Sequence, residues 1–339
     1  MNTSTLSTVL ALLLLFSIGP LLAQNPIPGT DAQSFQITSK SDTINYLVVG
    51  KADKQTTKPT LLFLQGSLPV PLVFDLDSFY HINLPFDYRK LTKDYQIVVI
   101  SMPHTPLVVD KTHLNRQYCY VPDASQPKSF SRSYLEDNHL DQFVQRTQQV
   151  IQDLRNKPWV NAQEIHLVGH SQGAKIAAVV AAENEQITSV SLLGFNAFGR
   201  FDEFIRKARV KLRSGQINGE QYQKQLEEYY EQWRAIHQDP DNVEKGHLSW
   251  TSFSIDYTPY LLKIEAPMYI GYGTEDIGAE NCDLIPLKLI EQGKTNFTLK
   301  PFEGWNHNFF ELKEGRPDYK QGPHWTEVMT AITTWHQTF

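Results

Sequence analysis

Short apolar runs alternate with helix-like patterns along the chain from residue 60 onward. The runs are bounded by turn residues, as buried strands are, and they occupy residues 60–64, 95–100, 189–193, 268–272 and 297–302. Between them, apolar residues recur every three to four positions, as on one face of a helix, over residues 140–154, 284–292 and 324–336. Strands that alternate with helices predict a mostly parallel sheet with helices on both faces, an α/β fold.

The N-terminal part has two different patterns. Residues 34–38 and 43–49 alternate in strand fashion on either side of a turn, which predicts an antiparallel hairpin. Before them, residues 9–18 form a continuous apolar run, which Gly19-Pro20-Leu21-Leu22-Ala23-Gln24 follows. The run is short for a membrane span and fits the core of a signal peptide that is cleaved after Ala23.

Two features keep alternatives to a cleaved leader open. No Lys or Arg precedes the run, and Leu21 is large for a cleavage site, so an uncleaved N-terminal anchor is the main alternative. A buried helix fits less well because residues 24–33 are polar and contain two prolines. No Cys lies near the expected cleavage point, so a lipid anchor is not supported. We expect a signal peptide at 1–23, a secreted or periplasmic domain at 24–339, and no stable membrane span after cleavage.

The most informative motif lies at residues 165–174. An apolar run leads directly into Gly169-His170-Ser171-Gln172-Gly173, and small and apolar residues follow. This pattern predicts a buried strand, a sharp turn and a helix. The two glycines flank Ser171, where a strained turn brings backbone segments too close for side chains. A plain surface turn is the alternative, since so short a motif also occurs by chance.

In this Gly-x-Ser-x-Gly arrangement the chain resembles the α/β-hydrolase superfamily, over about residues 60–339. The resemblance implies the α/β-hydrolase fold and an exposed nucleophilic Ser171. A nucleophilic Ser rather than Asp argues against dehalogenase and epoxide-hydrolase chemistry. We expect neither a cofactor nor a metal ion.

The superfamily order of catalytic residues is Ser, then an acid, then His. Gly273-Thr274-Glu275-Asp276 follows the expected strand at 268–272, and Gly304-Trp305-Asn306-His307 follows that at 297–302. Both loops would lie at the carboxyl ends of parallel strands, beside Ser171. Asp276 matches the superfamily's Gly-x-x-Asp position and His307 its loop histidine, so we expect Asp276 as the acid and His307 as the base.

Other acids and histidines are weaker candidates. Glu275 would point elsewhere on a tight loop, and Asp283 is expected to cap the following helix. The remaining histidines have other expected roles at the end of a strand, beside the nucleophile or in the last helix: His104, His170, His324 and His336.

Acyl transfer also needs N–H donors for the developing oxyanion. The backbone N–H of Gln172 is one candidate. Gln65-Gly66-Ser67 follows the strand at 60–64, where the superfamily usually has His-Gly-x, so the Ser67 N–H is the second. A plain turn is the alternative at this loop. No triple-glycine run is present, so lipases of that subtype are not indicated.

Residues 199–248 differ in character from the rest of the chain. They are rich in Glu, Gln, Lys and Tyr, and Gly215 and Gly219 divide two helical patterns. The resemblance makes this the place for an inserted helical cap, with a pair of ordinary surface helices as the alternative. Residues 110–132 have no clear periodicity and are expected to form a surface excursion near the rim of the site.

Composition adds a few limits. The chain has 339 residues, a net charge of −6 and 41% hydrophobic residues, which suit one large core, and no basic block suggests nucleic acid. Cys119 and Cys282 could pair in an oxidising compartment or remain as two buried thiols.

The sequence therefore predicts a secreted or periplasmic serine hydrolase that cleaves a carboxylic ester through an acyl-enzyme. Its substrate would be a small-molecule ester or a short peptide. A peptidase or amidase of the same fold is the nearest alternative. A non-catalytic binding protein is a third, although such proteins usually lose one of the three catalytic residues.

Overall fold

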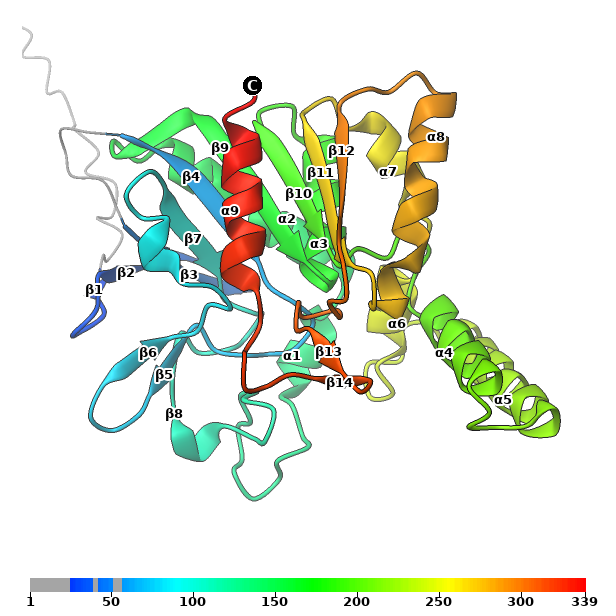
Figure 1. The fold of residues 1–339 in the computed structure, drawn as a ribbon. Coiled ribbons are helices and arrows are strands. Elements are labelled where there is room, and N and C mark those ends of the chain that lie inside the picture. The colour runs from blue at the N-terminus through cyan, green and yellow to red at the C-terminus, as the bar shows by residue number, and fades with distance from the viewer. Residues whose placement is uncertain (1–24, 39–41, 51–56) are drawn as a thin grey trace, which may run out of the picture.

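A computed structural model describes residues 25–38, 42–50 and 57–339, so the expected signal peptide and the turn at 39–41 lie outside the described residues. Over these residues the main sheet has nine strands (Figure 1). In spatial order they are β1 (Asn25–Pro26), β2 (Ala32–Thr38), β3 (Thr43–Val49), β7 (Gln96–Ile100), β4 (Lys58–Leu64), β9 (Val160–His170), β10 (Ser189–Leu193), β11 (Met268–Gly273) and β12 (Phe297–Phe302).

The direction of the strands divides this sheet into two parts. Strands β1, β2 and β3 are antiparallel at one edge, and β3 pairs antiparallel with β7. From β7 to β12 every neighbouring pair is parallel. The carboxyl ends of these six strands therefore meet at one edge, shown at the bottom of Figure 1. This edge is where a parallel sheet binds its ligands.

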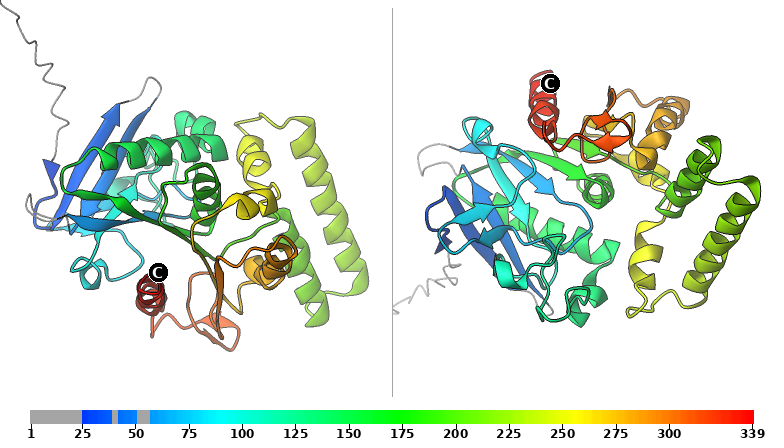
Figure 2. Two further views of the ribbon diagram at one scale, coloured as in Figure 1. Left: turned by 90° about the horizontal axis from the view of Figure 1, so that it is seen from above. Right: turned by 60° about the horizontal axis from the view of Figure 1, so that its bottom comes forward.

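Helices cover both faces of the sheet, as the sequence predicted (Figure 2). Apolar side chains of one face pack with those of α2 (Leu140–Arg155), α3 (Gln172–Glu183), α7 (Thr258–Lys263) and α8 (Ile285–Glu291). The opposite face packs against α9 (Trp325–His336), through residues such as Trp325, Val328 and Ile332. Because side chains alternate along a strand, Leu62 and Leu64 join the first core while Leu61 and Phe63 join the second.

The segment 199–248 contains two long helices, α4 (Phe201–Arg213) and α5 (Gly219–Gln238), which project together from the side of the molecule (Figures 1 and 2). Aromatic side chains hold the pair together and join it to α6 (His247–Phe253). The Phe201 and Trp233 ring centroids lie 4.5 Å apart, and those of Phe201 and Trp250 lie 5.2 Å apart. The aromatic face of α5 thus packs, half-buried, against α4 and α6.

Several short elements were not predicted. A second sheet consists of β6 (Tyr80–Ile82), β5 (Val73–Asp75) and β8 (Val108–Asp110), in that order. Strands of three residues carry too few alternations to show a period. The other short elements are η1 (Tyr88–Lys90), η2 (Lys111–His113), α1 (Arg132–Asp137), β13 (Leu312–Lys313) and β14 (Arg316–Pro317).

The prediction that Asp283 caps the helix at 284–292 is wrong. The 3₁₀ helix η3 (Ile277–Leu284) runs directly into α8, and Leu284 occupies the position before its first residue. Asp283 therefore lies inside a continuous helical path, and its carboxylate accepts a hydrogen bond from the Tyr272 hydroxyl instead.

Cys119 and Cys282 are both buried and unpaired, and the Cys282 Sγ lies 3.1 Å from the Phe195 carbonyl oxygen. Within the described ranges, no helix is both long enough and apolar enough to cross a membrane.

Candidate active site

Ser171 occupies the sharp turn between β9, which ends at His170, and α3, which begins at Gln172. Its φ of 57° and ψ of −117° place it in a strained backbone conformation that residues other than Gly rarely adopt. The turn is compact because α3 starts directly over the sheet. A Cβ on Gly169 would lie 2.2 Å from the Gly173 carbonyl oxygen, and one on Gly173 would lie 2.0 Å from that of Leu64. Glycine is therefore required at both positions.

This close approach predicts a large effect on stability. We expect Gly173→Ala to lower the free energy of unfolding by about 1–3 kcal/mol or more, because the methyl group would overlap backbone that cannot easily move. Gly219→Ala is the matched control, since a Cβ there meets nothing within 4 Å and should change stability by less than about 1 kcal/mol. Denaturant unfolding measures both variants. Equal stabilities would contradict the packing at this turn.

The three predicted catalytic residues meet at the carboxyl edge of the sheet. His307 Nε2 lies 2.9 Å from Ser171 Oγ, and His307 Nδ1 lies 2.6 Å from Asp276 Oδ2. The loops that carry Asp276 and His307 are adjacent because β11 and β12 are parallel neighbours. The Gly278 N–H donates to the other carboxylate oxygen of Asp276 at 2.9 Å, which fixes the orientation of this buried acid.

Two opposing effects act on the pKa of His307. Burial of the ring disfavours its charged form, but the hydrogen bond and the negative charge of Asp276 outweigh this, so the pKa of His307 is raised above its ordinary value. The charged imidazolium form of His307 is thus stabilised.

The raised pKa predicts the pH dependence of any reaction that uses His307 as a base. The ring must be neutral to accept a proton, so kcat/KM for a small neutral ester should rise with pH, with a midpoint above about 6.5. Rates measured between about pH 5 and 9 test this. A profile that is flat, or that falls with rising pH, would argue against His307 as the base.

The other candidates lie outside this chain of hydrogen bonds. Glu275 is exposed to solvent. His104 Nε2 lies 2.7 Å from an Asp137 carboxylate oxygen, and the His324 ring stacks on Trp305. His336 lies beside Ser189, with its Nε2 3.1 Å from the Ser189 Oγ.

His170 is buried under the site. Its Nε2 lies 2.9 Å from the His307 carbonyl oxygen, so a neutral His170 can donate to it. Burial above all, and then the nearby His307, lowers the pKa of His170 to about 3 and keeps the ring neutral. His170 therefore holds the loop that carries His307, as its expected packing role suggested.

A cavity of about 1050 Å³ opens over Ser171 and His307. Ser67 and Gln172, the two predicted oxyanion donors, both line it, and the Tyr134 hydroxyl donates to the Ser67 carbonyl oxygen at 3.2 Å. Their N–H groups remain predictions for the oxyanion hole. The excursion at 110–132 also reaches the cavity, through residues such as Leu114 and Tyr118.

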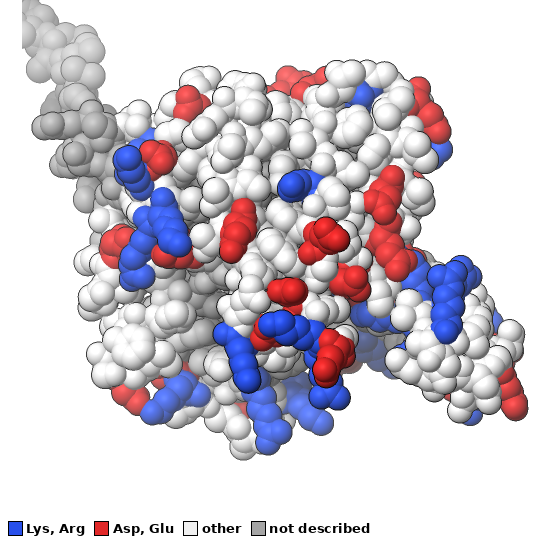
Figure 3. Space-filling model, viewed as in Figure 1, with Lys and Arg blue, Asp and Glu red and all other residues white. Residues whose placement is uncertain are grey.

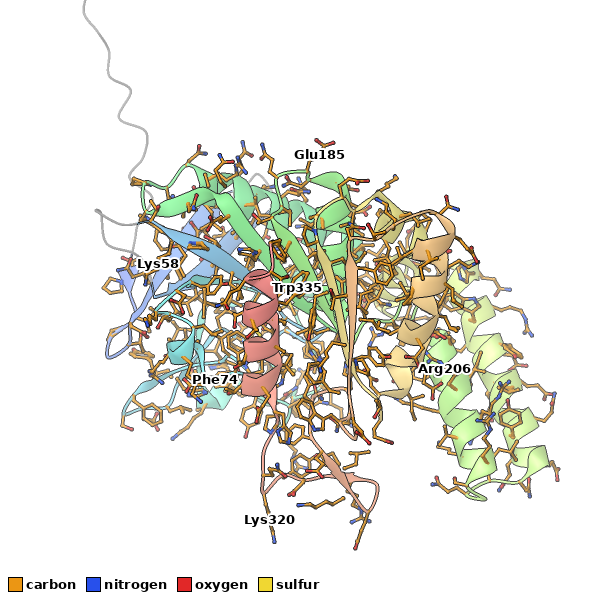
Figure 4. All side chains as sticks on the ribbon, turned by 45° about the horizontal axis from the view of Figure 1, so that its top comes forward. Lys58, Phe74, Glu185, Arg206, Lys320 and Trp335 are labelled. Atoms are coloured by element: carbon orange, nitrogen blue, oxygen red, sulfur yellow. The ribbon has the colours of Figure 1, made fainter. Side chains whose placement is uncertain are left out.

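Two parts of the cavity were missed by the sequence analysis. One is bounded by Phe74 and His81 of the small sheet, and Figure 4 labels Phe74 there. The other contains Lys175, Arg200 and Glu203. Lys175 is the only charged residue between Gln172 and Ala182, which is the one signal that could have singled it out. Within 199–248, Arg200 and Glu203 are the described residues that line the cavity.

Comparison with known proteins agrees with this architecture. The family model described as "BAAT / Acyl-CoA thioester hydrolase C terminal" matches residues 147–250, which include Ser171. E-2-(acetamidomethylene)succinate hydrolase is similar in structure, with a TM-score of 0.51 and 13% identity over 90% of this chain and 98% of that protein. The alpha/beta hydrolase GrgF from Penicillium sp. sh18 has a TM-score of 0.51 and 14% identity, over 90% and 96% of the two chains. The chain has the α/β-hydrolase fold.

A third α/β-hydrolase structure, acetyl xylan esterase 1 from Thermoanaerobacterium sp. JW/SL YS485, has a TM-score of 0.50 and 13% identity over 87% of this chain and 83% of that protein. Two further matching structures are those of longer proteins. This chain spans 33% of one of them and 62% of the other. No curated protein matches the chain in sequence.

Proposed function

We propose that this chain is a serine hydrolase that cleaves a carboxylic ester. The observation that carries the proposal is the continuous hydrogen-bonded chain from Ser171 Oγ through the His307 ring to the buried Asp276. A serine hydroxyl is a weak nucleophile until a neighbouring base takes its proton, and this geometry supplies the base and the acid that orients it.

The reaction follows from these positions. Ser171 Oγ attacks the carbonyl carbon while its proton moves to His307 Nε2, and the N–H groups of Gln172 and Ser67 bind the oxyanion. The ester C–O bond then breaks, the alcohol leaves with the proton from His307, and an acyl-enzyme on Ser171 remains. Water attacks this intermediate with His307 again as base, and the acid is released as Ser171 regains its proton.

Relatives support hydrolysis of an acyl group without fixing the substrate. The matched family is described as an acyl-CoA thioester hydrolase domain, and one structural neighbour is an acetyl xylan esterase. Ser171 and the start of segment 199–248 face the same cavity, so we propose that this segment acts as the cap and shapes the cavity through Arg200 and Glu203.

A matched substrate panel tests the reaction type. The 4-nitrophenyl ester, the 4-nitroanilide and the coenzyme A thioester of butyric acid share an acyl group and differ in the bond to be broken. We expect the ester to have the highest kcat/KM. A higher value for the anilide would favour an amidase, and a higher value for the thioester would favour a thioesterase. Activity on none of them would contradict the proposal.

We also propose that the chain is exported and that the mature protein begins near Gln24, on the basis of the apolar run at 9–18 and the small Ala23. Intact-mass analysis of the exported material measures this. A full-length cytoplasmic species as the sole product would contradict it.

A further inference from the structure

Arg200 is a cation without a partner in the cavity over Ser171. Among the described residues it makes no hydrogen bond and no ion pair, and its guanidinium lies 4.6 Å from the centre of the Trp250 ring. The other Lys and Arg side chains that line the cavity are engaged: Lys111 pairs with Asp77, and Lys175 donates to the Phe253 carbonyl oxygen at 2.8 Å. A half-buried arginine whose N–H donors are unpaired favours the binding of an anion.

The neighbouring acids, Asp202 and Glu203, form their hydrogen bonds and ion pairs with other residues. Glu203 lines the same cavity but is paired with Lys207. Asp202 receives a hydrogen bond from Arg206 at 2.6 Å and others from Asn196 and Asn281, each at 2.9 Å. Figure 4 labels Arg206 on α4, beside η3 and α8. The charge of Glu203 attracts Arg200, but no hydrogen bond or ion pair joins Arg200 to either carboxylate in the described structure.

A second cation lies close to Arg200. Lys175 is buried, and among the described residues its three donors have one hydrogen-bond acceptor, the Phe253 carbonyl oxygen. Burial, and then the nearby positive charge of Arg200, lowers the pKa of Lys175 to about 7. A negative group bound between the two side chains would relieve their repulsion and favour the charged form of Lys175.

Gln172 adds an independent sign of a missing ligand. Gln172 lines the same cavity and is 95% buried, and neither its amide nitrogen nor its amide oxygen has a hydrogen-bond partner in the described structure. A buried amide without partners is costly, so we expect the side chain to turn toward a polar group of a bound substrate. Gln172 directly follows Ser171, which places this polar group near the scissile bond.

We propose that the substrate carries a free carboxylate in addition to its ester, and that Arg200 binds this carboxylate with Lys175 and the Gln172 amide in the same part of the cavity. The planar guanidinium of an arginine matches a carboxylate in a two-point contact. This inference rests on the proposed function for the reaction and adds the substrate class. Figure 3 shows several Lys and Arg side chains at the lower edge of the molecule, where the parallel strands end, with Asp and Glu side chains among them.

Two pairs of esters test the proposal. The 4-nitrophenyl hemiester of glutaric acid is compared with 4-nitrophenyl valerate, which places the carboxylate on the acyl side. The acetyl ester of 4-hydroxybenzoate is compared with phenyl acetate, which places it on the alcohol side. We expect the wild-type protein to prefer the acidic ester in one pair. In that pair, Arg200→Met should lower the ratio of kcat/KM for the acidic ester to that for the neutral ester by about 10- to 100-fold, mainly through KM.

Two further variants sharpen the comparison. Arg209→Met removes an exposed arginine from α4, the helix that begins directly after Arg200, and should leave the ratio unchanged. Arg200→Lys keeps the charge but not the two-point contact, so its ratio should lie between those of the wild type and Arg200→Met. Wild-type protein that prefers neither acidic ester, or an equal loss for both esters in Arg200→Met, would overturn the proposal.

A binding experiment separates this inference from the proposed function. Glutarate is titrated calorimetrically into the Ser171→Ala protein, which needs no catalysis, and binding should be lost in the Ser171→Ala, Arg200→Met double variant. Glutarate binding without ester cleavage by the wild type would overturn the proposed function but keep the anion site. Cleavage of neutral esters without glutarate binding would overturn the anion site but keep the proposed function.

Discussion

Ser171→Ala is expected to lower kcat for the best ester by about 10⁴-fold or more, and His307→Ala by a similar factor. Without the hydroxyl no acyl-enzyme can form. Without the imidazole, which lies 2.9 Å from Ser171 Oγ, no other described side chain is hydrogen-bonded to that oxygen to accept its proton. Because both residues serve one step, the double variant should be hardly slower than either single variant. Steady-state rates of the three purified proteins measure this.

Ser214→Ala serves as the control because Ser214 is an exposed serine at the end of α4, away from the cavity. It should retain wild-type activity. Losses that multiply in the double variant would show that Ser171 and His307 do not share a step. Full activity of Ser171→Ala would end the serine-hydrolase account.

Asp276→Asn is expected to have the second largest effect, a loss of about 10³- to 10⁴-fold in kcat. Oδ1 of Asp276 accepts from the Gly278 N–H, so an asparagine oxygen should keep that place and turn its NH₂ toward His307 Nδ1. His307 would then carry its proton on Nε2, the atom that must accept one from Ser171. The variant should fold normally and still be nearly inactive.

Asp283→Asn is the matched control. Asp283 lies in the same segment and also accepts a hydrogen bond, from the Tyr272 hydroxyl, which an asparagine oxygen can still accept. Its kcat should stay close to that of the wild type. Equal losses in the two variants would indicate a general disturbance of the segment 277–284 rather than a tautomer effect at His307.

The sequence was informative wherever local pattern and chain order determine position. The turn at Ser171 follows from a buried strand, two glycines and a helix that are contiguous in sequence. Asp276 and His307 follow two strands that pair in parallel, so their order along the chain was enough to bring them together. The charge relations between them depend on burial and needed the structure.

The parts that were not predicted depend on long-range packing. Arg200, directly before α4, lines the cavity beside Trp250 of α6, and no periodic pattern encodes that position. The small sheet pairs β5 with β8, whose partner residues are 35 positions apart in the chain, and both strands are too short to show a period. Asp283 resembled a cap only because the 3₁₀ segment before α8 was not anticipated.

The central claim is that Ser171 is an activated nucleophile, and labelling by a fluorophosphonate tests it most directly. The wild-type protein should gain the mass of one adduct, and peptide mapping should place it on Ser171. Ser171→Ala should gain none, and His307→Ala should react far more slowly because its serine keeps its proton. An adduct on another residue, or equally fast labelling of Ser171→Ala, would contradict the account.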